Sequence, residues 1–123
     1  MQTVRIYRLK DLDKRTRARM LAAQREAARV WMDCVARHSA ARTERSSWPD
    51  RDDLQRETKG GQYALHSQSI QMVCHQFLAN VEAIKQLRET NPRHRYPYHP
   101  KKYMTVQWPA HGTRPQVLLV PSA

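Results

Sequence analysis

Two long stretches of this sequence repeat apolar or weakly polar residues every three or four positions, and this spacing constrains the fold more than any other feature. A period near 3.6 residues predicts an amphipathic helix, because only one face of such a helix is then apolar. The first stretch repeats Met20, Ala23, Ala27, Val30, Trp31, Cys34, Val35 and His38. The second repeats Ile70, Val73, Cys74, Phe77, Leu78, Val81, Ile84 and Leu87. We therefore expect two long helices, antiparallel to each other, with Trp31, Phe77 and the two cysteines buried between them as small apolar thiols.

The ends of these helices carry recognisable signals. Asp13 and Ser67 are the expected N-caps, because a short oxygen-bearing side chain can accept a hydrogen bond from the first turn. The first helix should run from Lys14 to Arg45, and Asn91–Pro92 should end the second.

The polar segment between the two helices, residues 41–61, is broken by Pro49 and closed by Gly60–Gly61. It predicts a loop that contains one short helix near Asp50 to Glu57.

Alternating residues at both ends of the chain predict short strands. Residues Thr3 to Leu9 alternate, as do Met104, Val106 and Trp108, and a further strand is expected at 116–120. The predicted fold class is α+β: two long antiparallel helices plus a short helix, inserted in a small antiparallel β-sheet or partial barrel. We expect a single basic module over residues 1–123, with wedge-like strands in 1–10 and 103–121, a helical part over 13–91, and a basic aromatic loop over 92–102.

The charge of the chain points to a polyanionic partner. Lys and Arg number 22 against 11 Asp and Glu, which gives a formal net charge of +11. Self-repulsion of this size destabilises a compact state unless an oppositely charged partner relieves it. Nucleic acid is the leading candidate. The first helix contributes a basic stripe, with nine Lys or Arg against three acids between Lys14 and Arg45.

The most unusual part of the chain follows Pro92. No acidic residue occurs from Thr90 to Ala123, whereas RHRYPYHPKKY at 93–103 mixes cations with aromatic rings. Cations can contact phosphates, and aromatic rings can stack on unpaired bases. A solvated basic loop without a ligand is the other interpretation of this segment.

The start of the second helix, LHSQSIQ, places Ser67, Gln68 and Gln71 on its first turn. Gln can pair with adenine in a groove, and Ser can reach most bases. The same residues are also ordinary capping material, so both interpretations stay open.

No catalytic or metal-binding signature is found. The histidines and cysteines have no zinc-ligand spacing, and no phosphate-binding loop or nucleophile motif occurs. Asp50, Asp52 and Asp53 are interpreted as helix-start charges that compensate the helix dipole rather than as metal ligands. We therefore expect no enzyme activity, no metal and no cofactor. No apolar stretch reaches the ~20 residues of a membrane span, so the expected location is intracellular and no membrane partner is expected.

The segments REAARVWMDCVARH, YALHSQSIQMVCHQFLANVEAIKQLR and RYPYHPKKYMTVQWP, taken with an opening strand that ends in YRL, resemble the N-terminal region of OrfB/TnpB transposon proteins and type V CRISPR effectors. These families are RNA-guided DNA nucleases in which a β-barrel wedge domain is interrupted by a helical recognition domain. The resemblance implies that Ser67, Gln68 and Gln71 face the target-adjacent DNA motif. It also implies that RYPYHPKK contacts RNA or the guide–target duplex, while guide pairing reads the sequence.

The resemblance stops short of the nuclease. In these families a RuvC-like domain with catalytic carboxylates follows this region, whereas this sequence has no acid after Glu89. We therefore expect no nuclease activity from this chain, which would be a fragment, a decayed gene product or half of a split effector.

The expected partners are guide or structured RNA and target DNA, with a separate nuclease subunit as a further candidate, in a prokaryotic, nucleoid-associated cytoplasmic setting. The predicted nucleic-acid-binding residues are Arg15, Arg19, Arg25, Arg29, Ser67, Gln68, Gln71, Arg93, Arg95, Tyr96, Tyr98, Lys101 and Lys102.

Two alternatives remain open. In one, the chain is a stand-alone helical DNA-binding regulator whose LHSQ helix enters the major groove as part of a dimer. In the other, it is a structural protein that uses the pair of helices around Trp31 and Phe77 to bind a larger nuclease, with its charge serving only solubility.

Overall fold

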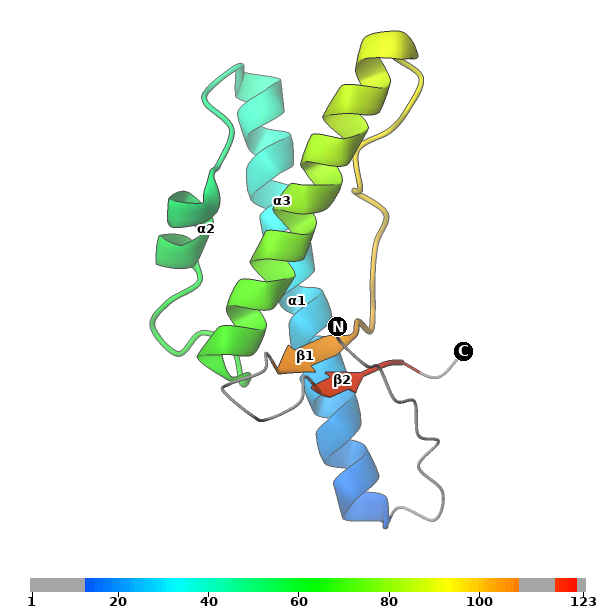
Figure 1. Ribbon diagram of the computed structural model, residues 1–123. Coiled ribbons are helices and arrows are strands. Elements are labelled where there is room, and N and C mark those ends of the chain that lie inside the picture. Colours follow the sequence, from blue (N-terminus) through cyan, green and yellow to red (C-terminus); the bar gives the residue numbers. More distant parts are fainter. Residues whose placement is uncertain (1–12, 109–116, 122–123) are drawn as a thin grey trace, which may run out of the picture.

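The computed structural model describes residues 13–108 and 117–121. Within them the chain forms α1 (Lys14–Glu44), α2 (Arg51–Glu57) and α3 (Ser67–Thr90), followed by β1 (Val106–Trp108) and β2 (Val117–Leu119) (Figure 1). This is a small α+β fold, as predicted. The strand predicted at Thr3 to Leu9 lies outside the described residues, and so does any closure of the sheet into a partial barrel through it.

The helix starts are capped by side chains. Asp13 accepts a hydrogen bond from the backbone N–H of Thr16 at 2.6 Å, as predicted for the start of α1. The N-cap of α3 is His66 rather than Ser67: its Nδ1 accepts from the N–H of Gln68 at 3.2 Å. The prediction was one residue late because an imidazole nitrogen does here what an oxygen more often does.

The three aspartates near α2 act as a helix start. The Asp50 side chain accepts from the N–H of Asp53 at 2.8 Å, and the Asp53 side chain accepts from the N–H of Asp50 at 3.0 Å. This reciprocal capping box confirms the interpretation of these acids as helix-start residues. It also holds the pKa of Asp53 below its usual value, first through the backbone hydrogen bond from Asp50.

The core lies where α1 meets α3. Trp31 and Phe77 are buried there and meet edge to face, with ring centroids 5.2 Å apart. The sulfurs of Cys34 and Cys74 lie 3.9 Å apart in the same layer. Both thiols are free and buried, and the hydrogen bond to Cys74 together with burial raises the pKa of Cys34. The predicted content of this helical interface is therefore confirmed.

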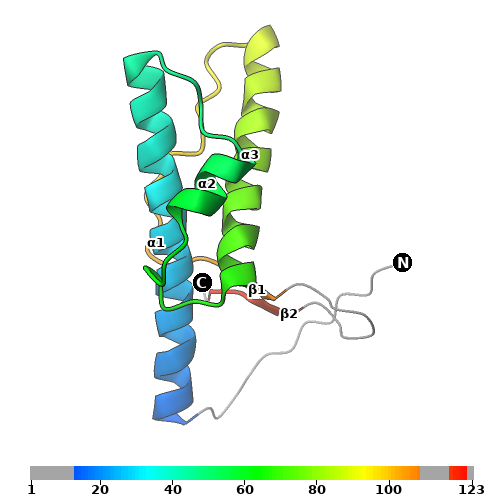
Figure 2. The ribbon, with the colours of Figure 1, turned by 90° about the vertical axis from the view of Figure 1, so that its left-hand side faces the viewer.

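The relative direction of the two long helices was predicted wrongly. Cys34 packs on Cys74, and further along both helices Arg42 and Arg88 reach the same tyrosine ring. Residues later in α1 therefore lie beside residues later in α3, so the two helices run parallel, as Figures 1 and 2 show. A parallel arrangement requires a return connection, and residues 45–66 are long enough to run back along a 24-residue helix of about 36 Å.

The two parallel helices are covered on opposite sides. α2 and its flanking turns lie across one side, where Leu54 is fully buried. Residues 92–105, which contain no helix or strand, run back along the other side (Figure 2). We call residues 92–105 the loop segment. The N–H of Met104 donates to the carbonyl of Gln24 at 3.1 Å and joins the end of the loop segment to α1.

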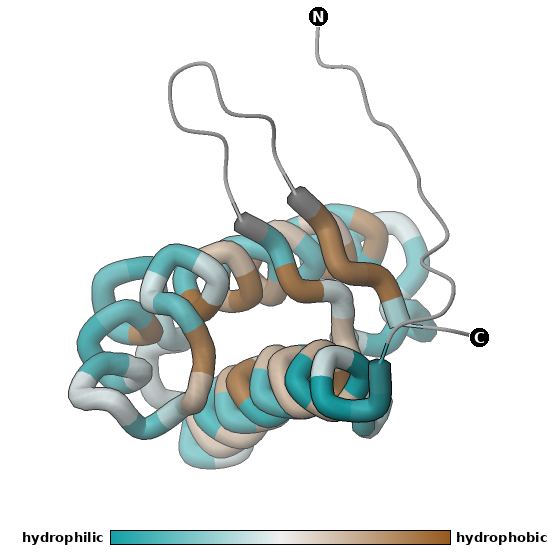
Figure 3. The backbone as a smooth tube through the Cα atoms, turned by 90° about the horizontal axis from the view of Figure 1, so that it is seen from below, coloured by the Kyte–Doolittle hydropathy of each residue, from teal (hydrophilic) through white to brown (hydrophobic). Residues whose placement is uncertain are grey.

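The sheet closes one end of the helical interface. β1 and β2 are antiparallel, with Val106 opposite Leu119 and Gln107 opposite Leu118. Val106 is fully buried, so the short sheet extends the core beyond the first turns of α3. In Figure 3 β2 is hydrophobic, whereas the start of α1 is hydrophilic. That start extends past the sheet (Figures 1 and 2).

Candidate nucleic-acid interface

An aromatic cluster forms where the last turns of α1 and α3 meet the loop segment. We define it as His38, Trp48, Tyr96 and Tyr98. His38 lies 4.7 Å from Trp48 and 5.7 Å from Tyr98 between ring centroids, and Tyr96 and Tyr98 stack at 6.1 Å. The hydroxyl of Tyr98 also hydrogen-bonds to Nδ1 of His38.

Within the aromatic cluster, Tyr96 and Tyr98 are packing residues of the fold. Both rings are half-buried and pack against the core. Their predicted contact with RNA stays a prediction, but their faces are already engaged: Tyr96 has a tyrosine, a tryptophan and two guanidinium groups as neighbours.

Three cations converge on this cluster from two helices. The guanidinium carbon of Arg42 lies 4.4 Å from the centroid of Tyr96, and that of Arg88 lies 5.1 Å from it. The ammonium of Lys85 lies 5.7 Å from the centroid of Trp48. Arg88 is held further by a 2.6 Å hydrogen bond to the carbonyl of His94. Cations over aromatic faces are attracted by the ring quadrupole, which fixes these side chains in place.

The loop segment carries further cations along α1. Lys101 places its ammonium 4.8 Å from the centroid of Trp31 and so covers the buried indole. Lys102 lies 5.8 Å from the ring of Tyr103, whose hydroxyl accepts a hydrogen bond from Arg25 at 3.2 Å. This bond lowers the pKa of Tyr103. Arg93 and Arg95 are exposed on the same segment.

Two carboxylates of α1, Glu26 and Asp33, contact the segment between α2 and α3. The only ion pairs in residues 13–108 and 117–121 are Arg29 with Glu26 and Arg56 with Asp53, each at 2.9 Å. Glu26 also accepts from the N–H of Ala64, so it faces the connection between α2 and α3.

Asp33 lies on that same side. It accepts a hydrogen bond from the hydroxyl of Tyr63, and burial followed by this bond raises the pKa of Tyr63 to about 12. Glu26, Asp33 and Asp53 therefore have their partners on the α2 side, whereas every charged side chain of the loop segment is cationic.

The four predicted arginines of α1 lie in three different settings. Arg15 and Arg19 are exposed on the turns that extend past the sheet. Arg25 contacts the loop segment through Tyr103. Arg29 instead donates to the carbonyl of Gln62 at 2.8 Å and already has Glu26 as its carboxylate partner. The structure therefore separates Arg29 from the other three.

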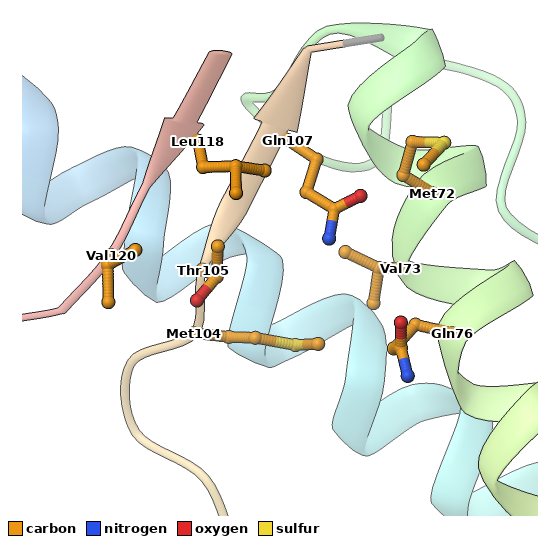
Figure 4. Close-up of a pocket in the computed structure, with 8 residues that line it drawn as sticks. All are labelled: Met72, Val73, Gln76, Met104, Thr105, Gln107, Leu118 and Val120. Atoms are coloured by element: carbon orange, nitrogen blue, oxygen red, sulfur yellow. The ribbon is translucent and has the colours of Figure 1, made fainter. Parts of the chain in front are cut away.

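The start of α3 lies away from the aromatic cluster, at the sheet end of the molecule. Ser67 is exposed, whereas Gln68 and Gln71 are half-buried. Beside this start a shallow pocket of about 350 Å³ lies between α3 and the sheet (Figure 4). Its lining is apolar and amide-bearing, without a charged side chain: Met72, Val73, Gln76, Met104, Thr105, Gln107, Leu118 and Val120. The pocket is therefore separate from the cationic surfaces.

The described residues hold neither a metal-binding cluster nor a membrane-spanning helix. No three His, Cys, Asp or Glu side chains gather there in a way that would hold a metal ion. None of the three helices has the length and apolar character needed to cross a membrane.

The predicted set of binding residues omitted Trp48 of the aromatic cluster and the three cations that converge on the cluster, Arg42, Lys85 and Arg88. They are spread over three segments of the chain. From the sequence, Arg42 was counted only as one cation of the basic stripe of the first helix, and Arg88 was not singled out. Arg42, Arg88 and Trp48 share contact with Tyr96, and Lys85 contacts Trp48, so only the fold brings them together.

Comparison of the chain with protein-family models, with curated proteins and with solved structures finds no match.

Proposed function

We propose that this chain is a nucleic-acid-binding module of an RNA-guided effector, similar to the wedge and recognition region of OrfB/TnpB and type V proteins. It would contact guide RNA and the target DNA with its adjacent motif. The observation that carries the nucleic-acid part is the loop segment, which has no acid and lies along α1 with cations that lack a carboxylate partner among the described residues.

The physical argument concerns phosphate contacts. Each unpaired guanidinium or ammonium that meets a phosphate releases condensed counterions, and this release supplies most of the sequence-independent affinity for nucleic acids. The loop segment is also held by Tyr98 and Met104 against α1. Cations on a segment that is already ordered lose less conformational entropy when they bind.

The effector part of the proposal depends on the resemblance of the LHSQ helix and the YP…KK…W segment. It includes no catalysis by this chain.

The salt dependence of binding tests the electrostatic argument. With ~6 phosphate contacts, the logarithm of the binding constant for a 20-base-pair duplex should fall against the logarithm of salt concentration with a slope of roughly −5. Fluorescence anisotropy with labelled RNA and duplex DNA measures this slope. A flat response would contradict the proposal.

A matched pair of variants tests the location. Arg93→Gln with Arg95→Gln removes two exposed cations from the loop segment, whereas Arg51→Gln with Lys59→Gln removes two exposed cations from the α2 side. The net charge changes equally in both. We expect the loop variant to lower the size of the salt slope by about 1–2 and the α2-side variant to leave it unchanged. Equal losses in both variants would contradict the assigned face.

The RNA that co-purifies with the chain tests the effector part. The resemblance leads us to expect one dominant structured RNA species after purification from cells and sequencing. A broad mixture that follows cellular abundance would contradict a guide-RNA partner while leaving general nucleic-acid binding in place.

A further inference from the structure

Arg42 and Arg88 meet on a single ring although they come from the ends of different helices. Their guanidinium carbons lie 4.4 and 5.1 Å from the centroid of Tyr96. Two like charges held on one ring repel each other, and the ring quadrupole offsets this only in part. Such an arrangement is favourable for an anion that lies between or beside them.

No carboxylate of the described residues fulfils this role. The two ion pairs found among residues 13–108 and 117–121 involve Arg29 and Arg56, not Arg42 or Arg88. Arg88 gives one N–H to the carbonyl of His94, which orients its guanidinium, and the planar donor fork of an arginine suits two phosphate oxygens.

The helix dipoles explain part of the arrangement. Because α1 and α3 run parallel, both carry their negative ends to this place, and Arg42 and Arg88 lie in the two last turns. Cations are favoured there by typically 0.3–1 kcal/mol each. The dipoles do not explain why the neighbouring indole of Trp48 stays 37% exposed while it packs on Tyr96.

Trp48 adds an aromatic ring on which a base can stack, which three cations alone would not provide. Its ring centroid is 5.6 Å from that of Tyr96, and the ammonium of Lys85 lies 5.7 Å from it. A base that stacks on the indole would carry its own phosphate close to Lys85. Base stacking on aromatic side chains does not depend on sequence, because every base has a π-face.

We propose that Arg42, Lys85 and Arg88 bind a phosphate of an unpaired nucleic-acid strand, and that Trp48 stacks on an adjacent base. This inference rests on the proposed function and adds to it the class of ligand, which is a single strand or an unpaired RNA loop bound at this end of the molecule. A duplex has no free base for Trp48, because its bases are already stacked on one another.

The test compares an eight-nucleotide oligouridylate with a 20-base-pair DNA duplex as probes. Arg42→Gln with Arg88→Gln should weaken oligouridylate binding about tenfold or more, and duplex binding far less. Trp48→Leu should weaken oligouridylate binding about fivefold or more through lost stacking. Arg51→Gln with Lys59→Gln is the control of equal charge and should bind oligouridylate like the wild type.

A second variant separates geometry from charge and folding. Because both guanidinium groups pack on Tyr96, Arg42→Lys with Arg88→Lys keeps the charges and removes the planar forks. It should bind oligouridylate more weakly than the wild type and more tightly than the glutamine variant. The urea midpoint of each variant shows that the fold is retained.

The outcomes distinguish this inference from the proposed function. If the wild type binds nucleic acid with a steep salt slope, and the Arg42, Arg88 and Trp48 variants bind oligouridylate equally well, the inference is wrong and the cations serve only the helix ends. If the wild type binds neither probe at low salt, the proposed function itself is wrong.

Discussion

His38 is a titratable group in an almost fully buried position, with 1% of its surface exposed. Its Nδ1 bonds to the hydroxyl of Tyr98, and its Nε2 has no hydrogen-bond partner among the described residues. Burial, and then the charge of Arg42, hold the pKa of His38 below its usual value. The neutral imidazole is therefore the form that the folded state favours.

This lowered pKa predicts an acid-sensitive fold. An unfolded histidine has a pKa near 6.5, so between this value and the lower folded value the unfolded state binds more protons. The contribution to stability is present above pH 6.5 and is lost as the pH falls towards the folded pKa. His75, whose pKa is lowered first by burial and then by Arg51, acts in the same direction. Urea unfolding between pH 7.5 and pH 5 should show a falling midpoint.

The matched variants are His38→Gln and His99→Gln. His99 is exposed and stands as the control. The first change should flatten the dependence of the urea midpoint on pH, and the second should leave it as in the wild type. A wild-type midpoint that rises on acidification from pH 7 to pH 5 would contradict this account.

Single residues also show how far the sequence predicts the site. The pattern of RHRYPYHPKKY indicated a segment of mixed cations and rings, and in the structure this segment runs along the side of the helices opposite α2. The sequence did not reveal that Tyr96 and Tyr98 pack on His38, because a ring that stacks within the chain and a ring that awaits a base have the same local pattern. The distinguishing contacts come from residues about 60 positions away.

Among the elements, α1 begins with an unfavourable charge pattern. Its first turn contains no acid, and Lys14, Arg15 and Arg17 lie at the positive end of the helix dipole. Cations at this end oppose the dipole by about 0.3–1 kcal/mol each. A bound phosphate would reverse the sign of this interaction, as helix starts favour anions.

Arg15→Glu is therefore expected to act oppositely on stability and binding. The free energy of unfolding should rise by about 0.3–1 kcal/mol for each of the two unit charges by which the side chain changes. Arg15 is exposed, so the substitution removes no buried contact. The same change should weaken binding to duplex DNA. Arg15→Gln should give an intermediate value in both measurements, by urea unfolding and by anisotropy. A loss of stability in the glutamate variant would count against the dipole argument.

The sequence predicts where the helices begin and end, but not how they are oriented relative to each other. Apolar spacing and caps predicted the bounds of α1, α2 and α3 to within a residue, because those signals are local. The direction of α3 relative to α1 is not local. A buried face can pack on either orientation, and the long connection over residues 45–66 permits both. Trp31 and Phe77 were therefore predicted as partners, while their helices were predicted in the wrong relative direction.

For the whole molecule, the formal net charge of +11 is compensated by few ion pairs in the described part. Screening should weaken the repulsion that opposes the compact state, since the Debye length falls to about 10 Å at 0.1 M salt. We expect the urea midpoint to rise between 0.02 and ~0.3 M sodium chloride, while nucleic-acid affinity falls over the same range. A midpoint that falls with salt would show that the charges attract one another within the fold.

The parallel course of α1 and α3 has a consequence for how the protein acquires its fold. Cys34 and Cys74 are separated by 40 positions in the chain, so the main core forms only after a long loop closes. Each doubling of such a loop costs about 0.6 kcal/mol, and contacts of this range slow folding relative to helical hairpins. On the ribosome, α1 emerges with Trp31 uncovered and remains without its partner until α3 has been synthesised. During that interval the nascent chain presents an apolar stripe, which is the kind of surface that chaperones bind.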